Sequence, residues 1–143
     1  MSVKQFSVFI ENTPGKLAAF TRMLGENGVD LVSLCVADTT HFGIVRGIVA
    51  DDERAVRLIS DSGYTVKLTD VLAVSVDDRP GGLADVLELL AAHEIGVEYL
   101  YSFVRSLAGR ALVILRVTRV EDAERILVQN GVKLLSQEEV RGL

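Results

Sequence analysis

The stretch FSVFIENTPGKLA (residues 6–18) recurs 66 residues later as LAVSVDDRPGGLA (residues 72–84). The only two prolines of the chain, Pro14 and Pro80, coincide in this alignment, and each is followed by a glycine. Further along the chain the shift grows to 68 residues. Two extra residues near positions 105–110, in a hairpin loop that tolerates insertion, account for the change. The chain is therefore a duplication of a unit of about 70 residues.

The first unit begins with a strand and a helix. Residues 4–10 alternate in polarity, with Phe6, Val8 and Ile10 on one face, which is typical of a half-buried strand. A helix with apolar residues at helical spacing follows; Asn12 or Thr13 is placed to cap it, and Pro14 suits its first position. Its expected inward side chains are Leu17, Phe20 and Leu24, and Gly28 is expected to end it as a left-handed cap.

The remaining elements follow the same order in both copies. In copy one we expect strands at 29–37 and 42–50, a helix at 52–62 and a final strand at 64–68. In copy two the later counterparts are strands at 97–104, 111–117 and 132–135, with a helix between the last two. The capping-box pattern at residues 136–139 predicts one more helical turn.

The order β-α-β-β-α-β, found twice, predicts an α+β fold. It corresponds to two ferredoxin-like units, each an antiparallel sheet with its helices on one face. We expect the first domain at residues 1–70 and the second at residues 71–143. Thr69 and Asp70 would form a short linker between the last strand of copy one and the first strand of copy two.

Composition excludes several classes of protein. Apolar residues make up 49% of the chain, and the net charge of −5 is spread evenly over both copies, without a basic block. This argues against a nucleic-acid partner. The single cysteine, Cys35, cannot form an internal disulfide. No signal peptide and no apolar run of about 18 residues is present, so we expect a cytoplasmic protein without a membrane partner.

The case for catalysis is weak. His41 lies in an expected hairpin turn and His93 near the end of a helix, and neither has a candidate nucleophile beside it in sequence. The acidic run at residues 51–53 sits where a helix begins, where negative charge complements the helix dipole. Metal-binding and phosphate-binding motifs are missing. We therefore expect no enzyme activity, no metal site and no cofactor.

The loop after the first strand is the best candidate for binding a ligand. Backbone N–H groups from Gly15 to Leu17 open a helix, and such a terminus binds a carboxylate. Gly15 carries no side chain to block close approach, and Asn12 can both donate and accept. Asp30, at the start of a neighbouring strand, is a candidate acceptor for an ammonium group. The alternative is an ordinary capped helix with a surface aspartate.

The motif NxPGxL (residues 12–17), followed by NGVDL (residues 27–31), resembles the ACT domain, a regulatory module attached to many enzymes of amino-acid metabolism. The second copy is similar, with DxPGxL (residues 78–83) and IGVEY (residues 95–99). The resemblance covers nearly the whole chain, in the order that the fold requires. Free-standing tandem ACT proteins of this size resemble the chain most.

The resemblance implies that an effector binds at the interface of two ACT units, between the loop after the first strand and the start of the second strand. In copy one it assigns this role to Glu11, Asn12, Thr13, Pro14, Gly15, Lys16, Leu17 and Asp30. The weaker equivalents in copy two are Asp78, Pro80, Gly81, Leu83 and Gly96.

The second copy departs from the ACT pattern at two of these positions. Gly96 stands where an asparagine is familiar, and Asp78 replaces Asn12 with a carboxylate that would repel an incoming one. We therefore expect two unequal sites, with the second copy as a structural partner.

An aromatic stripe, Tyr99, Tyr101 and Phe103, alternates along one strand of copy two and so points to one face. Core packing, burial by the other copy or a second chain, and lining of a ligand pocket all remain open. Apolar patches of this kind usually mark an interface, so we expect a homodimer.

Together these observations predict a regulatory protein that senses a free amino acid at an ACT–ACT interface and acts on a regulated enzyme in trans. The conjunction of Asn12, Pro14, Gly15 and Asp30 favours this interpretation. The alternative is an assembly or scaffold module with the same fold, which binds no ligand and regulates an enzyme by protein contact.

Overall fold

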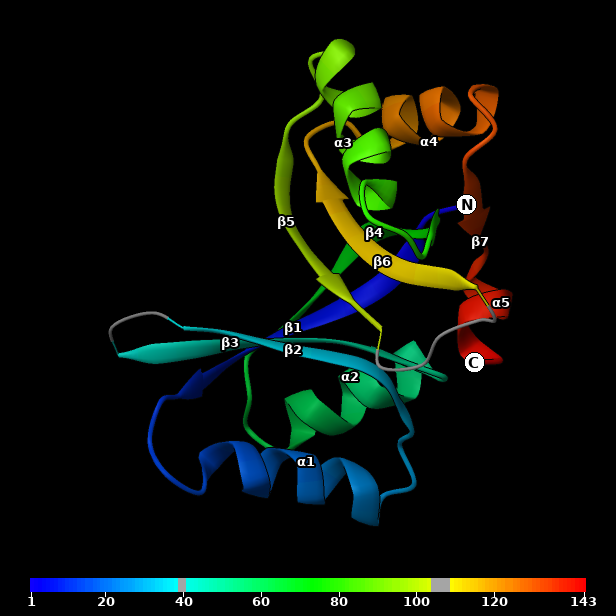
Figure 1. Cartoon of the computed structure of the whole chain (residues 1–143). Coiled ribbons are helices and arrows are strands. Elements are labelled where there is room, and N and C mark those ends of the chain that lie inside the picture. Colours follow the sequence, from blue (N-terminus) through cyan, green and yellow to red (C-terminus); the bar gives the residue numbers. More distant parts are fainter. Residues whose placement is uncertain (39–40, 104–108) are drawn as a thin grey trace. The chain divides into compact units, whose positions relative to one another are not determined.

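A computed structural model describes residues 1–38, 41–103 and 109–143 (Figure 1). The chain divides into two compact units. The first unit is Lys4–Thr69, and the second unit combines Met1–Val3 with Asp70–Leu143. Most of the expected two-residue insertion, and the last residue of the strand expected at 97–104, lie outside the described residues.

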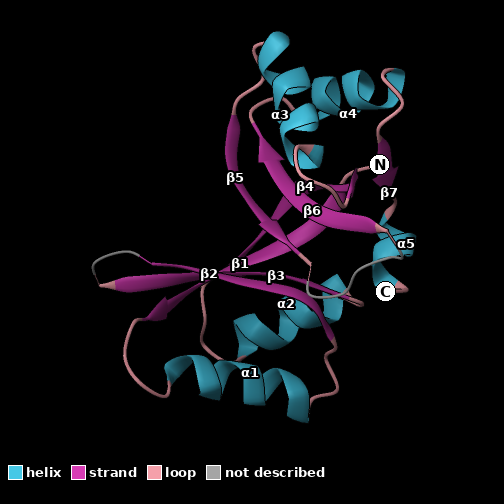
Figure 2. Cartoon of the chain, in the orientation of Figure 1, coloured by secondary structure: helices cyan, strands magenta, loops and turns pink. Residues whose placement is uncertain are grey.

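The first unit has the strand order β2-β3-β1-β4. Its elements are β1 (Val3–Glu11), α1 (Lys16–Glu26), β2 (Leu31–Asp38), β3 (Phe42–Val49), α2 (Asp52–Asp61) and the start of β4 (Val66–Asp77). β3 pairs antiparallel with both β1 and β2. Alternate residues of β1, namely Phe6, Val8 and Ile10, pack with residues of both helices in one core. The two helices therefore cover the same face of the sheet (Figure 2).

The second unit repeats this arrangement. Its further elements are α3 (Gly82–Ala92), β5 (Val97–Ser102), β6 (Arg110–Val117), α4 (Val120–Gln129), β7 (Lys133–Leu135) and α5 (Gln137–Arg141). β4 lies between β7 and β6, and β6 pairs with β5, all antiparallel. Leu72, Val74 and Val76 of β4 pack with residues of α3 and α4 in one core. The α+β fold with two ferredoxin-like units is thus confirmed.

β4 differs from the expectation at the junction of the two copies. Thr69 and Asp70 do not form a linker but lie inside one strand of 12 residues, Val66–Asp77. The last strand of copy one and the first strand of copy two are therefore continuous. The segment contains no glycine or proline that would break a strand, and valine and threonine favour one.

The start of α1 also differs from the expectation. Its N-cap is Gly15 at φ 89°, and no side chain caps the helix, so neither Asn12 nor Thr13 does so. Pro14 lies in the preceding turn rather than at the first helical position. Gly81 begins α3 with the same backbone conformation, at φ 88°. A positive φ is readily adopted only by glycine, which explains why both copies have one after the proline.

Other local predictions are confirmed. Gly28 follows the C-cap of α1 with φ 70°, as a left-handed residue. Asp51 caps α2 by accepting a hydrogen bond from the backbone of Arg54. Ser136 and Glu139 form the complete capping box of α5. The acidic residues at 51–53 therefore belong to a helix start.

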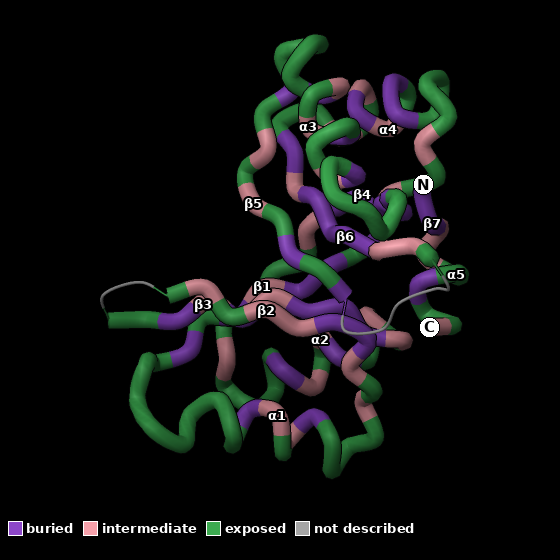
Figure 3. The backbone as a smooth tube through the Cα atoms, in the orientation of Figure 1, coloured by how far each residue is buried: buried purple, intermediate pink, exposed green. Residues whose placement is uncertain are grey.

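Burial follows the predicted faces with one exception (Figure 3). Phe20 and Leu24 of α1 are fully buried, whereas Leu17 is 38% exposed and does not join the core. Within residues 1–38, 41–103 and 109–143, no helix is long and apolar enough to cross a membrane.

Candidate functional site

The loop at residues 12–17 joins β1 to α1 and is held by its own backbone. The N–H of Thr13 donates to the carbonyl oxygen of Glu11 at 2.9 Å, and that of Lys16 donates to Thr13 at 3.3 Å. One of the three N–H groups expected to face a ligand is therefore engaged. Pro14 and Gly15 are exposed at the tip of the loop. The loop is a preformed helix entry, and anions are favoured at such a position.

Asn12 faces the end of β2. Its side-chain amide donates to Oδ1 of Asp38 at 2.9 Å, and both residues are exposed. The register explains the contact, because Glu11 pairs with Phe42 and Asp38 pairs with the next residue, Gly43. Asp38 is thus the carboxylate beside the loop. The sequence interpretation missed it, although the strand order of a ferredoxin-like unit places the ends of its first and second strands at the same edge.

Asp30 lies at the opposite end of the strands from Asn12, which contradicts the prediction that the two residues come together within one unit. Asp30 precedes Leu31, and Leu31 pairs with Val49 at the far end of β3. The length of β3 separates the two positions by roughly 23 Å, at about 3.3 Å per residue. The cause is topological: α1 returns the chain, so β2 begins where β1 begins. One free amino acid cannot touch both residues of the same unit.

A small cavity of about 70 Å³ lies under the loop. Val36 and Leu17, which are 49% and 38% exposed, contribute apolar surface to it. Its full lining is Ile10, Glu11, Asn12, Thr13, Leu17, Val36, Gly43 and Val45. Leu17 lines this cavity and is not part of the core. The volume suits a small group rather than a whole large side chain.

A second cavity, of about 340 Å³, also adjoins the end of β1. It is lined by Phe9, Ile10, Glu11, Lys16, Phe42, Gly63, Tyr64 and Thr65. We call it the aromatic cavity. It shares Ile10 and Glu11 with the small cavity, and at its edge Nζ of Lys16 lies 4.0 Å from Oε2 of Glu11.

The second unit has a cavity at the equivalent position, of about 180 Å³. Seven of its lining residues correspond to those of the aromatic cavity by the shifts of 66 and 68: Ser75, Val76, Asp77, Gly82, Arg110, Gly131 and Val132. Arg110 takes the place of Phe42. Its guanidinium pairs with Asp77 and donates to Oγ and the carbonyl oxygen of Ser75 at 3.0 and 2.7 Å.

The charged residues in and around the loop after β4 also form ion pairs with one another. Arg79 pairs with Asp85 and lies 3.6 Å from Asp77. The backbone N–H of Asp78 donates to Gly109 at 3.4 Å. In the first unit the neutral side chain of Asn12 binds the carboxylate of Asp38. In the second unit the nearby carboxylates of Asp77 and Asp85 form ion pairs with arginines.

The other predicted residues of copy two are scattered. Pro80 and Gly81 are exposed at the loop tip and Leu83 is half-buried. Gly96 lies at the opposite edge of the sheet, because it precedes Val97, which pairs with Val117. Its backbone N–H donates to Oγ1 of Thr118 at 3.2 Å.

The aromatic stripe of β5 is not an open patch. Tyr101 and Phe103 are 8% and 9% exposed, and Tyr99 is half-buried. Its neighbour Leu100, on the other face, is 40% exposed. A second chain is therefore not needed to cover Tyr101 and Phe103.

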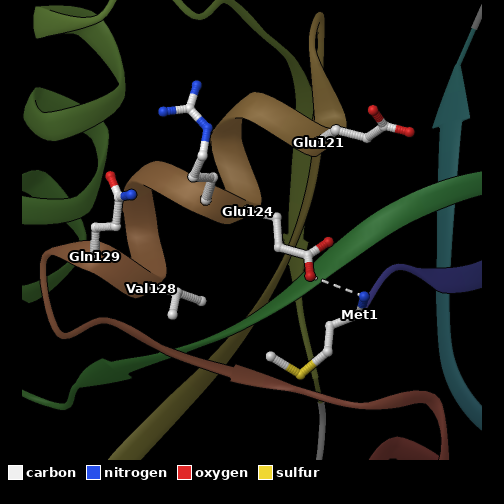
Figure 4. A pocket seen from close by; sticks show the side chains of 6 residues that line it. Met1, Glu121, Glu124, Val128 and Gln129 are labelled. Atoms are coloured by element: carbon white, nitrogen blue, oxygen red, sulfur yellow. Dashed lines mark hydrogen bonds and ion pairs between the residues drawn. The ribbon is translucent and has the colours of Figure 1, made fainter.

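A larger cavity of about 560 Å³ lies beside α4 in the second unit (Figure 4). The terminal ammonium of Met1 pairs there with Glu124 at 2.9 Å, and Val128 is 48% exposed. Glu121, Arg125 and Gln129 complete the lining. None of these residues belongs to the loop after β4, so this cavity is separate from the predicted site.

The two histidines lie at the end of a helix and in a turn. Nδ1 of His93 lies 2.9 Å from the carbonyl oxygen of Leu89 on its own helix, and His41 is exposed in the turn before β3. Across the part of the chain that the structure describes, no three His, Cys, Asp or Glu residues gather in a way that could hold a metal ion.

Comparison with known proteins extends over the whole chain. A family model described as an ACT domain pair matches residues 1–143. Protein BT0572 from Bacteroides thetaiotaomicron has a similar structure, with 35% identity and a TM-score of 0.93, and covers 100% of this chain and 98% of its own. No curated protein matches the chain.

Two more distant structures share the fold. They are regulatory subunits of aspartate kinase, from Thermus thermophilus in a ligand-free form and from Thermus flavus. Each is 19% identical, with TM-scores of 0.64 and 0.62. The alignments cover 90% and 88% of this chain and 92% and 90% of the subunits.

Proposed function

Because the chain belongs to the family of ACT domain pairs, we propose that it is a non-catalytic regulatory protein that senses a free amino acid through its first unit. The observation that carries the proposal is the pairing of Asn12 with Asp38 beside the start of α1. An amide donor and a carboxylate acceptor meet there, next to the loop that leads to the N-cap Gly15 of α1. A free amino acid needs partners for a carboxylate and for an ammonium, and these groups supply both.

In this site the ligand carboxylate binds the amide of Asn12 and the backbone N–H groups at the start of α1. The ligand ammonium replaces Asn12 as the partner of Asp38. The equivalent region of the second unit supports the choice of copy, because Asp77 and Asp85 there are held by Arg79 and Arg110. The second unit then serves as a structural partner.

We propose further that a homodimer completes the site. β2 stands at one end of the strand order, and its eight residues contain no proline and no charge before Asp38. An end strand of this kind is suited to pairing with another strand. If two chains of a homodimer pair their β2 strands antiparallel, the partner's Asp30 comes to the end of the strands where Asn12 lies. This arrangement accounts for both residues of the ACT motif, which one unit alone cannot bring together.

The ligand-bound state would act on an enzyme in trans. The names of the two Thermus structures support this part of the proposal, since each is a regulatory subunit of an aspartate kinase. The likeness to them extends to the fold, so the enzyme that this chain regulates is to be found by experiment.

The proposal is tested by titrating the purified protein with each of the twenty amino acids and measuring the melting temperature. A ligand at about 100 times its dissociation constant adds roughly 2.7 kcal/mol to the free energy of unfolding. One amino acid, or a small related group, is expected to stabilise the protein. If calorimetry detects no binding of any amino acid at millimolar concentration, the sensor proposal fails and the scaffold alternative replaces it.

A further inference from the structure

The sheet of the first unit has one face that its own helices do not cover. Val8 of β1 and Val45 of β3 pair with each other and pack with residues of α1 and α2 in the core (Figure 2). Because side chains alternate along a strand, the intervening residues point to the opposite side of the sheet. We call this side the open face and define it by Phe9, Glu11, Ala37, Phe42, Ile44 and Arg46.

The centre of the open face is apolar. Phe9, Ile44 and Ala37 form one row across three strands, because Ile44 pairs with both of the other residues. Phe42 lies next to this row, and the side chains of Phe9 and Phe42 are 56% and 51% exposed. Ile44 is half-buried and does not belong to the core on the helix side. Large apolar side chains that gather on a surface usually mark a contact site.

The equivalent face of the second unit is buried. By the shifts of 66 and 68 residues, its row consists of Ser75, Leu112 and Phe103. These residues are only 2%, 2% and 9% exposed. The first unit thus exposes a phenylalanine, Phe9, at the position where the second unit buries a serine. The fold allows this face to be covered, and Phe9 gains more from removal from water than Ser75 does.

Two opposite charges lie on either side of the apolar row. Glu11 pairs with Phe42 at one side, and Arg46 pairs with Ser7 at the other. The two charges are about 13 Å apart along the strands, at about 3.3 Å per residue. A two-fold axis that runs along the row, at right angles to the strands, reverses the strand direction in a second copy. Arg46 of that copy then comes over Phe42 and beside Glu11, and the same contact forms again with the copies exchanged.

We propose that the open face binds a second copy of this chain, sheet against sheet about this axis, and that Arg46 of each copy pairs with Glu11 of the other. Stacked sheets lie about 10 Å apart, a distance that long side chains span. Aromatic residues and arginine are enriched in such interfaces. Since Glu11 belongs to the loop of the predicted ligand site, the second copy contributes a cation to that site.

This contact is separate from the pairing of β2 strands proposed above, because it uses the face of the sheet and not its edge. The open face is much smaller than a standard interface, which has roughly 20–30 residues a side. It is therefore a weak contact, which forms at about hundreds of micromolar. At such concentrations it joins dimers that are paired through β2 into tetramers.

The test measures sedimentation of the full chain with Val36→Lys, which opposes pairing through the edge strand. Val36 points to the helix side, so this change leaves the open face intact. The variant is expected to form dimers at about 500 µM. Adding Phe9→Ser should weaken this association roughly tenfold or more. Adding Val128→Ser, at a position of α4 that is 48% exposed, should leave it unchanged.

Reversal of the two charges tests the arrangement of the copies. In the same background, Glu11→Arg and Arg46→Glu should each weaken association roughly tenfold or more, because like charges then face each other. A chain with both changes restores the pair with the signs exchanged, so its association should recover. Two positions about 13 Å apart in one sheet recover in this way only if they meet between copies.

Cys35 provides a second readout. It is the only cysteine of the chain, is half-buried and pairs with Arg46. With Val36→Lys, its reaction with a bulky maleimide should slow as the protein concentration rises from about 20 to about 500 µM. A rate that is the same at both concentrations, as cover by the second unit of the same chain would give, overturns the proposal. So does equal association with Phe9→Ser and Val128→Ser, or a double charge reversal that fails to recover. Pairing through β2 is tested by Val36→Lys against the parent, so the two proposals fail independently.

Discussion

The side-chain amide of Asn12 donates a 2.9 Å hydrogen bond to Oδ1 of Asp38, which connects the loop after β1 with the last residue of β2. The two residues are 26 positions apart in the chain and meet because β1 and β2 both flank β3. The bond places a donor and an acceptor side by side next to the loop that precedes α1. Exchange of this bond for contacts with an amino acid would link ligand binding to the end of the β2–β3 hairpin.

The first prediction concerns this pair. Asn12→Ala and Asp38→Ala should each weaken amino-acid binding at the loop by about 1.5–3 kcal/mol, the range for hydrogen bonds to charged groups. This corresponds to about a 10- to 150-fold loss of affinity, measured by calorimetry with the amino acid that the panel identifies. Asp30→Ala should have a similar effect if the partner's Asp30 completes the site.

Asp78→Ala is the matched control, since Asp78 occupies the position of Asn12 in the second copy. It should change affinity little, or raise it slightly by removing a repelling carboxylate. Loss of binding in Asp78→Ala, with binding intact in Asn12→Ala, would mean that the second unit holds the site.

The second prediction compares two glycines at the two ends of α1. Gly15 has φ 89° and Gly25 lies inside the helix, and a Cβ atom at either position would meet no atom within 4 Å. Any effect of alanine is therefore conformational. Gly15→Ala should lower the free energy of unfolding by about 1–2 kcal/mol, because a side chain disfavours the left-handed region. Gly25→Ala should raise it by about 0.5–1 kcal/mol.

Urea denaturation of the two variants beside the parent measures both changes. Opposite signs are the essential outcome. A gain in stability in both variants would show that the loop relaxes its backbone at position 15, whereas a loss in both would show that Gly25 is not a simple interior helix position.

The third prediction concerns the edge strand β2. Val36→Lys adds a charge to β2, the strand through which we propose that two chains pair. Charged residues on an edge strand oppose such pairing. Sedimentation should show a dimer for the parent at tens of micromolar (roughly the range for weak dimers) and a monomer for this variant. Val128→Lys is the control, because Val128 is 48% exposed on α4 and Val36 is 49% exposed.

A monomeric parent, or equal dimerisation of both variants, would contradict pairing through β2. A monomer that still binds the amino acid at the loop would further show that the partner's Asp30 is not required.

The fold was predictable because the same pattern of strands and helices occurs twice in the sequence. The alignment of Pro14-Gly15 with Pro80-Gly81 set the size of the unit, and the spacing of residues such as Phe6, Val8 and Ile10 gave the buried faces. The junction was less predictable. Thr69 and Asp70 are polar residues between two apolar runs, and only pairing within a sheet makes them part of a continuous strand.

The candidate site was predictable only in part. The loop at residues 12–17 can be found from its motif, but the acidic residue beside it depends on which strand ends meet. Asp30 was predicted beside the loop because it begins a neighbouring strand, and Asp38 was not among the predicted residues. Likewise, helical spacing places Leu17 inward, whereas the first turn of α1 lies beyond the core, over the small cavity. The aromatic cavity joins residues of four separate segments and has no local signal in the sequence.

The last prediction concerns acid and the C-terminal helix α5. The backbone N–H of Ser136 donates to Oε2 of Glu139 at 2.8 Å and is the main reason why the pKa of Glu139 lies below its ordinary value. The ammonium of Lys133, 3.9 Å from the same carboxylate, acts in the same direction.

Because the pKa is lower in the folded state, ionised Glu139 stabilises α5 above its ordinary pKa of about 4.3, and this contribution disappears as pH falls through the folded value. Hydrogen exchange of the α5 amides should therefore show weaker protection at about pH 3 than at about pH 6, relative to α1, whose first turn contains no acidic residue. Glu139→Gln keeps an acceptor for Ser136 but cannot titrate, so its α5 should lose this pH dependence. If α5 in Glu139→Gln loses protection at low pH as much as the parent does, the capping carboxylate is not the group responsible.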